Sequence, residues 1–294
     1  MSYAVSKKQQ LAGQGAILVS AFLMSTNGLF IKLISWHPVS LAGMRSVVAV
    51  LFLLVLRFIS PPPKEKKNPA LPLFAAALSF SATIFTFFIA NKLTTSANAI
   101  MLQYGAPIWG ALLAWLLIRE KPHWEHWTAL VLVLGGLALI FRDGLGRGAL
   151  LGDAIAVLCG IVFGAHSVFL RMLKNGNPSD AMLLAHVICA LIGLPFILHY
   201  PPSFSFSTTL SILYMGIFQI GLASLLFAYG LKTIRAVEAL LIDSVEPVLN
   251  PIWVLVVTGE KPAMVALAGG AMIIMAVVFS SLVGMRRKEG GSSA

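Results

Sequence analysis

The segment ANAIMLQYGAPIWGALLAWLLIREKP, residues 97–122, decides the fold, because residues 237–262 repeat its pattern at an offset of 140 without a gap. The second copy reads VEALLIDSVEPVLNPIWVLVVTGEKP. The matched positions are Ala99 with Ala239, Pro107 with Pro247, Glu120 with Glu260, Lys121 with Lys261, and Pro122 with Pro262. Upstream, Phe87 and Lys92 keep the same register with Phe227 and Lys232. Each copy is an apolar run that contains proline and ends in Glu-Lys-Pro.

Five hydrophobic spans lie between Pro122 and Pro262, and an odd number of crossings turns the second copy upside down in a membrane. Inverted repeats of helices are typical of secondary transporters, which bind substrate near the midplane between the repeats. The first and sixth spans also correspond: Gly13, Asn27, Phe30 and Lys32 fall opposite Gly152, His166, Phe169 and Arg171.

The composition is that of a membrane protein. Of 294 residues, 58% are hydrophobic and only 11% are charged, whereas soluble domains carry roughly 25% charged residues. The net charge of +10 comes from basic residues in short loops, so it indicates membrane orientation rather than nucleic-acid binding. Cys159 and Cys189 both lie in apolar runs, which favours packing over a disulfide or a metal site.

The apolar runs predict an all-α membrane protein with ten transmembrane helices arranged as two inverted five-helix repeats, residues 1–148 and 149–294. The expected spans are 13–34, 39–59, 70–91, 95–118, 124–141, 150–173, 181–199, 209–231, 236–258 and 263–284. With the N-terminus inside, 15 of the 21 Lys and Arg residues are cytoplasmic and 6 are not. Basic residues favour cytoplasmic loops, so both termini are expected in the cytoplasm and the protein in the inner (plasma) membrane.

The order of several residues resembles the EamA type of the drug/metabolite transporter superfamily. Those residues are Pro38 and Arg45 in span two, Lys92 after span three, Pro107 and Glu120 around span four, and their repeat at Leu231-Lys232, Glu246-Pro247 and Gly259-Glu260. The resemblance implies a ten-helix carrier that exports amino acids or other metabolites, and it is greatest to bacterial exporters of aromatic amino acids. One departure is Arg119-Glu120, where the family usually has Gly-Glu.

Polar residues inside spans are costly, so they usually face a bundle interior or a cavity. The candidate substrate-binding residues are Asn27, Ser79, Gln103, Tyr104, His166, Gln219, Asp243 and Glu246. Each has a structural alternative: Ser79, with Thr83 and Thr86, can bond its own helix backbone, and the amides can join neighbouring helices. His166 and Asp243 can lie in cytoplasmic water, Glu246 can brace its helix, and Arg45 is expected to cap or snorkel.

Asp243 is the sharpest candidate, because a charged carboxylate inside a span costs ~2.5–3.5 kcal/mol. It shares a helical face with Glu246 and Asn250, and it is the candidate for proton coupling. Pro107 and Pro247 each remove a helical hydrogen bond and are the candidate gating residues. The alternative for both prolines is a static kink.

These features predict a secondary transporter and not an enzyme. It is expected to export small amphipathic metabolites by alternating access, and the expected substrates are amino acids, including aromatic ones. The sequence contains no Walker-type glycine loop, so ATP is not expected to drive transport. No cofactor, metal or nucleic-acid partner is expected either. The expected partners are the small-molecule substrate, the lipid bilayer and protons. A membrane-embedded lipid-modifying enzyme and a lipid flippase stay open as alternatives, whereas no repeated filter supports a channel.

Overall fold

The computed structural model describes residues 6–26, 30, 34–59, 68–94, 96–142, 150–258 and 264–290, and every regular element in them is a helix. The elements in chain order are α1 (Lys7–Ser25), α3 (Pro38–Ile59), α4 (Ala70–Leu93), α5 (Ser96–Gln103), α6 (Ala106–Ile118), α7 (Trp124–Ile140), α8 (Leu150–Met172), α9 (Ser179–His199), α10 (Phe206–Tyr214), the π-helix η1 (Met215–Leu222), α11 (Ala223–Thr233), α12 (Ala236–Asp243), α13 (Glu246–Thr258) and α14 (Met264–Gly290).

Local sequence explains where several helices start. Ser6 caps α1: its hydroxyl accepts the Gln9 backbone N–H at 3.2 Å, and the Gln9 side chain accepts the Ser6 N–H at 2.9 Å. This reciprocal capping satisfies two N–H groups that a helix end leaves without partners. Pro38 opens α3, where a missing backbone N–H costs nothing. The fifth predicted span begins at Trp124, as expected.

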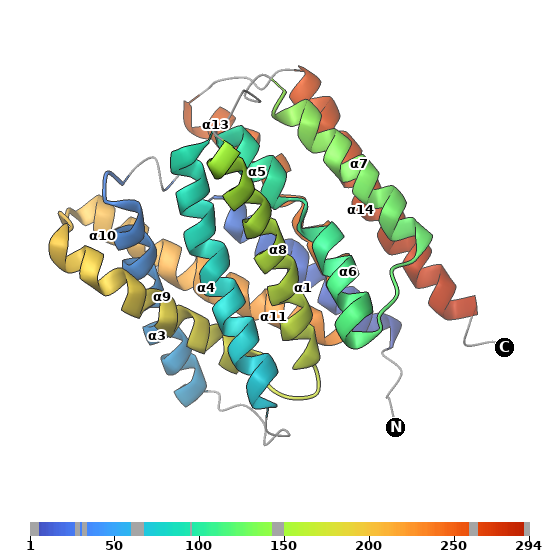
Figure 1. Cartoon of the computed structure of the whole chain (residues 1–294), viewed down its shortest axis with the longest axis horizontal. Coiled ribbons are helices and arrows are strands. Elements are labelled where there is room, and N and C mark those ends of the chain that lie inside the picture. The colour runs from blue at the N-terminus through green and yellow to red at the C-terminus, as the bar shows by residue number, and fades with distance from the viewer. Residues whose placement is uncertain are drawn as a thin grey trace.

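The helices form a central bundle flanked by two helix pairs. In the centre, α4 packs on α8 and α1 packs on α11, while α6 and α12 contact each other. On one side α3 packs on α9, and on the other α7 packs on α14 (Figure 1). Each flanking pair joins a helix of the first half to its counterpart in the second half. The buried apolar core runs through both halves, so they form one bundle.

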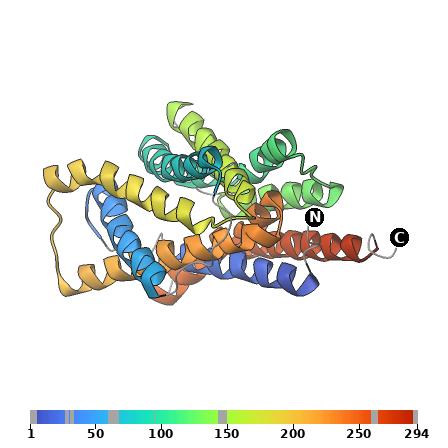
Figure 2. The same ribbon diagram turned by 90° about the horizontal axis from the view of Figure 1, so that it is seen from below.

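The first helix of each half packs against the other half. Seen from below, α1 and α8 lie in different layers: α1, in dark blue, runs beside the orange and red helices of the second half (Figure 2). The green α8 packs on α4, α5 and α6 of the first half. Equivalent glycines allow both approaches. A Cβ on Gly152 would lie 2.6 Å from the Leu93 carbonyl carbon, and one on Gly13 would overlap the Thr233 side chain.

Seven of the described helical segments are long and apolar enough to cross a membrane. They are Pro38–Ile59, Ala70–Asn91, Asn98–Ile118, Leu150–Met172, Ser179–His199, Phe206–Thr233 and Leu267–Gly284. The predicted number of ten is not confirmed by this criterion. The fifth span, α7, has only 17 residues, and the ninth is divided between α12 and α13. The first span includes residues 27–29 and 31–33, which lie outside the described residues.

Spans four and nine are broken at equivalent positions. The break between α5 and α6 falls at Tyr104-Gly105, and the break between α12 and α13 falls at Ser244-Val245, 140 residues later. Their hydrogen bonds match: the Gly105 N–H bonds to the Leu102 carbonyl at 3.2 Å, and the Val245 N–H to the Ile242 carbonyl at 3.1 Å. Each break lies just before a repeat proline, Pro107 or Pro247, which cannot donate to the carbonyl four residues back.

Span eight contains a feature that the hydrophobic pattern did not predict. Residues Met215–Leu222 form a π-helix between α10 and α11. Such segments often mark functional positions, because the wider turn reorients side chains. Here the π-helix carries the predicted site residue Gln219. Gly216 lies against Val48 and the Arg45 carbonyl of α3, which draws η1 close to that helix.

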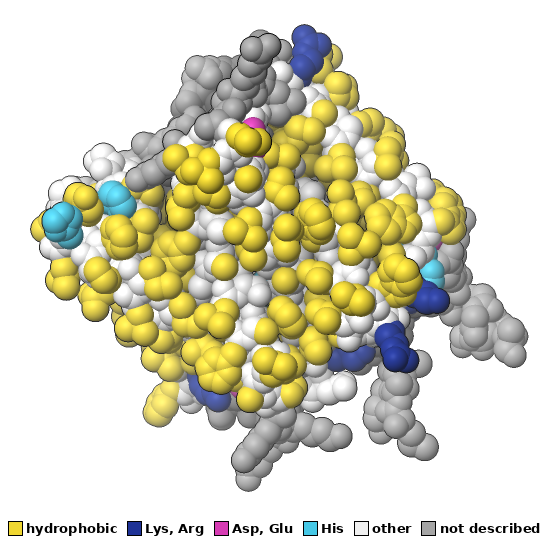
Figure 3. Space-filling model, viewed as in Figure 1, with side chains coloured by type: hydrophobic (Ala, Val, Ile, Leu, Met, Phe, Trp, Pro, Cys, Tyr) yellow, Lys and Arg dark blue, Asp and Glu magenta, His cyan; other side chains and the backbone are white. Residues whose placement is uncertain are grey.

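Apolar side chains cover the middle of the molecular surface. Phe58 is 91% exposed, Leu150 86% and Leu116 76%. Figure 3 shows hydrophobic side chains spread across one whole face, while the Lys and Arg side chains gather near its edges. An apolar surface of this extent is suited to lipid contact and not to water.

Candidate functional site

Three predicted site residues meet where the two broken spans pack together. Tyr104 lies in the break of span four, Asp243 ends α12 and Glu246 begins α13. Tyr104 is 7% exposed and Asp243 1%. The Tyr104 hydroxyl is close enough to the Glu246 carboxylate to interact with it as a donor, and Asp243 is close enough to Glu246 for electrostatic interaction. We call Tyr104, Asp243 and Glu246 the junction site.

The two carboxylates of the junction site have different surroundings. Glu246 stands in the first turn of α13, where the helix dipole favours a negative charge, and Tyr104 donates to it. Asp243 stands in the last turn of α12, where the dipole opposes a negative charge, and its Oδ1 is buried without a hydrogen-bond partner. Glu246 is therefore stabilised by the protein, whereas Asp243 is not.

The predicted shared face of Asp243, Glu246 and Asn250 is wrong as a description of one helix. The break at Ser244-Val245 separates Asp243 from Glu246, so regular helical spacing does not apply. The interaction between the two acids results from the turn instead. The side chain of Asn250 lies outside the described part of the chain.

A second group surrounds His166 on α8. The buried His166 ring donates from Nδ1 to the Ala76 carbonyl at 2.9 Å, and its Nε2 has no partner. Phe80 lies 5.0 Å from the His166 ring centre and 5.4 Å from that of His186, and Phe227 stacks on His166 at 6.2 Å. We call Phe80, His166, His186 and Phe227 the imidazole cluster.

The remaining predicted residues are dispersed. Gln219 is buried and donates from Nε2 to Thr26 Oγ1 at 3.0 Å, which joins η1 to the end of α1. Gln103 is half-buried at the end of α5, and Ser79 is half-buried on α4. Asn27 lies outside the described residues. The predicted backbone bonding is confirmed for Thr83 and Thr86, whose hydroxyls donate to the Ser79 and Ala82 carbonyls at 2.8 and 2.6 Å.

Three predicted alternatives are wrong in this structure. His166 and Asp243 are not solvated at the cytoplasmic side, because each is only 1% exposed. Arg45 does not snorkel: it is buried, with its guanidinium carbon 5.7 Å from the centre of the Phe88 ring. Sequence reasoning also missed His186, which bonds Ser224 Oγ at 3.3 Å. Its position in the middle of the apolar seventh span was the available signal.

A partly buried ion pair joins the halves at one end of the bundle. Arg171 of α8 donates from Nε to Glu120 Oε1 at 3.1 Å, and from Nη1 to the carbonyls of Leu231 and Lys232 at 2.7 and 2.9 Å. Arg119, just before Glu120, has a φ of 56°. This left-handed conformation favours glycine, so the Arg119 backbone is strained.

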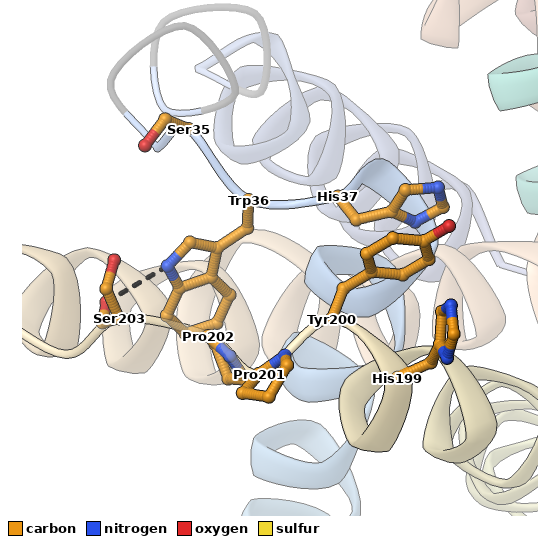
Figure 4. Close-up of a pocket in the computed structure, with 8 residues that line it drawn as sticks. All are labelled: Ser35, Trp36, His37, His199, Tyr200, Pro201, Pro202 and Ser203. Atoms are coloured by element: carbon orange, nitrogen blue, oxygen red, sulfur yellow. Dashed lines mark hydrogen bonds between the residues drawn. The ribbon is translucent and has the colours of Figure 1, made fainter.

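A surface pocket of about 350 Å³ lies away from all the predicted site residues. Its lining comes from the segment before α3, the last residue of α9 and the segment after α9: Ser35, Trp36, His37, His199, Tyr200, Pro201, Pro202 and Ser203. Trp36 donates to the Ser203 carbonyl at 3.0 Å, and His37 stacks on Tyr200 with ring centres 4.7 Å apart (Figure 4). Amphipathic aromatic rings are typical of a membrane–water boundary.

Known proteins resemble this chain over nearly its whole length. The chain is 26% identical over 280 residues to the uncharacterized transporter YwfM of Bacillus subtilis (strain 168), covering 92% of this chain and 94% of YwfM. It is 25% identical over 270 residues to an uncharacterized transporter of Archaeoglobus fulgidus, covering 91% and 96%. A protein crystal structure with 20% identity superposes with a TM-score of 0.81 over 96% of this chain and 99% of that one, which shows the shared fold.

One protein family matches nearly the whole chain. The EamA-like transporter family matches it twice, over residues 11–142 and 150–282. The two matches divide the chain at the segment between α7 and α8. This protein is therefore a multi-pass membrane protein that belongs to the EamA-like transporter family.

Proposed function

We propose that this protein is a secondary transporter that exports small amphipathic metabolites, amino acids and aromatic amino acids among them. The observation that carries the proposal is the junction site, where two broken spans from different halves bring together the buried Tyr104 and Asp243 and the half-buried Glu246. Broken helices at the interface of repeats are where transporters of this architecture bind substrate. The imidazole cluster and Gln219 extend the site along α8 and η1 with aromatic and polar groups.

Transport proceeds by alternating access between the two mouths of the bundle. The breaks before Pro107 and Pro247 are the flexible points, because neither proline can restore the lost helical bond. At one mouth the Arg171–Glu120 ion pair ties α8 and α11 to the end of α6. Tyr104 and Asp243 are buried in this conformation, so we expect the pair to separate when that mouth opens.

The membrane arrangement is ten spans in two inverted repeats, with both termini in the cytoplasm of the inner membrane. The start of α1 and the end of α14 lie toward the same end of the bundle (Figure 1), which supports an even number of crossings. The exchange of α1 and α8 between the halves supports a two-fold relation of the repeats. Asp243 couples transport to protons, because its carboxylate can take a proton when no other cation neutralises it.

Proteoliposomes test the function. The purified chain is reconstituted, and uptake of a panel of labelled amino acids is measured with and without an imposed proton gradient. We expect saturable uptake of aromatic amino acids that is accelerated by the gradient, and none in protein-free liposomes. Uptake of no panel member, together with movement of fluorescent lipid between leaflets, would instead support a flippase.

A further inference from the structure

The two acids of the junction site differ in the groups that surround their carboxylates. Glu246 has the Tyr104 hydroxyl and the start of α13. Asp243 Oδ1 is buried without a partner, in the last turn of α12. In addition, Pro247 cannot donate to the Asp243 backbone carbonyl, because proline has no N–H. A buried acceptor without a partner costs about 1–3 kcal/mol, and more when it is charged. This position therefore calls for a positively charged donor.

An ammonium group has the chemistry that this position requires. It carries three N–H donors and a positive charge on a compact centre, so it can serve a carboxylate and a nearby carbonyl together. A metal ion fits less well, because the described residues contain no group of three or more His, Cys, Asp or Glu side chains. Beside the acids, the Tyr104 ring offers an aromatic surface that suits an apolar substrate body and attracts cations.

We propose that Asp243 binds the ammonium group of the substrate, so that the transported class is amines and amino acids with an apolar body. Carboxylic acids without an amine are then excluded. The inference rests on the proposed function, because it names the substrate group that the junction site holds. Glu246 has Tyr104 and the start of α13 beside it, whereas Asp243 has a buried oxygen without a partner, so Asp243 is the carboxylate that distinguishes these classes.

Three ligands with the same aromatic body test the inference. Calorimetry measures the Kd of 2-phenylethylamine, phenylalanine and 3-phenylpropionate for the full chain purified in detergent. We expect the two ammonium compounds to bind at least tenfold more tightly than 3-phenylpropionate. Asp243→Asn should reduce this preference to less than threefold, whereas Asp243→Glu, which keeps the charge, should retain most of it. Size-exclusion profiles and thermal melting establish that each variant is folded.

Binding of 3-phenylpropionate as tight as that of 2-phenylethylamine would overturn the ammonium site, and this result needs only the parent chain. An undiminished preference in folded Asp243→Asn would also overturn it, as would binding of none of the three ligands. None of these results removes the transporter function if the proteoliposomes accumulate another metabolite. Failure of that uptake test, in contrast, would remove the function whatever the calorimetry shows.

Discussion

At the scale of single residues, Arg119 carries a backbone cost that the sequence alone indicates only through its family resemblance. Its φ of 56° is in the left-handed region, where a side chain costs roughly 1–2 kcal/mol. Glycine removes this strain but gains entropy in the unfolded chain, worth about 0.4–1 kcal/mol. We therefore expect Arg119→Gly to stabilise the protein by up to about 1 kcal/mol, measured as a higher apparent Tm in detergent.

Lys121→Gly is the matched control for this substitution, because Lys121 lies in the same loop and has no positive φ. It should lower the apparent Tm slightly or leave it unchanged. Arg119→Val should lower it, since a β-branched residue tolerates the left-handed region poorly. If Arg119→Gly destabilised the protein more than Lys121→Gly, the contacts of the Arg119 side chain would stabilise the fold by more than its backbone strain costs.

The residue types at the junction site could be predicted from sequence, but their environments could not. Charge in an apolar run marked Asp243 and Glu246 without three-dimensional information. Tyr104 interacts with Glu246, whereas Asp243 Oδ1 has no donor. This difference depends on contacts between distant spans, which the sequence does not show. For Arg45, capping or snorkelling was predicted; snorkelling is wrong for the same reason, because packing buries the side chain with its guanidinium over Phe88.

At the scale of elements, the apolar runs predicted where helices occur better than how each one is built. Hydropathy reports burial and not hydrogen-bond pattern, so it could not predict the π-helix at Met215–Leu222. The repeat prolines indicated weak points, and the helices break two residues before each of them. The two breaks share the 140-residue offset of the repeat, so we expect the two spans to move in equivalent ways.

Replacing either repeat proline should therefore stiffen one broken span. Pro107→Ala supplies an N–H that can reach the Gln103 carbonyl, and Pro247→Ala does the same for Asp243. One added hydrogen bond contributes about 1 kcal/mol, so we expect transport slower by about fivefold with normal expression. Initial uptake rates in proteoliposomes, corrected for the amount of protein, measure this effect.

Pro195→Ala provides the comparison, because Pro195 lies inside α9 of a flanking pair and away from both breaks. Its transport rate should stay close to that of the parent protein. Equal rates for the parent, Pro107→Ala and Pro247→Ala would leave static kinking as the role of the two repeat prolines.

At the scale of the whole molecule, the packing exchange between halves makes the bundle one mechanical unit. Helix α8 contacts α4, α5 and α6, while α1 contacts α11, α12 and α13. The repeat predicted which segments are equivalent, but sequence equivalence does not say which helices touch. The Arg171–Glu120 pair illustrates this point, because it joins an acid of the repeated Glu-Lys-Pro to a base from the other half.

The membrane orientation of the whole chain can be tested residue by residue. In a chain with Cys159 and Cys189 replaced, single cysteines are placed at Ser6, Lys174, Ser203 and Lys261. The distribution of Lys and Arg predicts that Ser6 and Lys174 face the cytoplasm and the other two face outward. In intact cells a membrane-impermeant thiol reagent should label only the cysteines at 203 and 261, while lysed cells should label all four. Ser6 and Ser203 are both exposed, so the comparison does not depend on burial. Labelling of the Lys174 position in intact cells would reverse the orientation and would place the Arg171–Glu120 pair, three residues away from it, at the outer mouth.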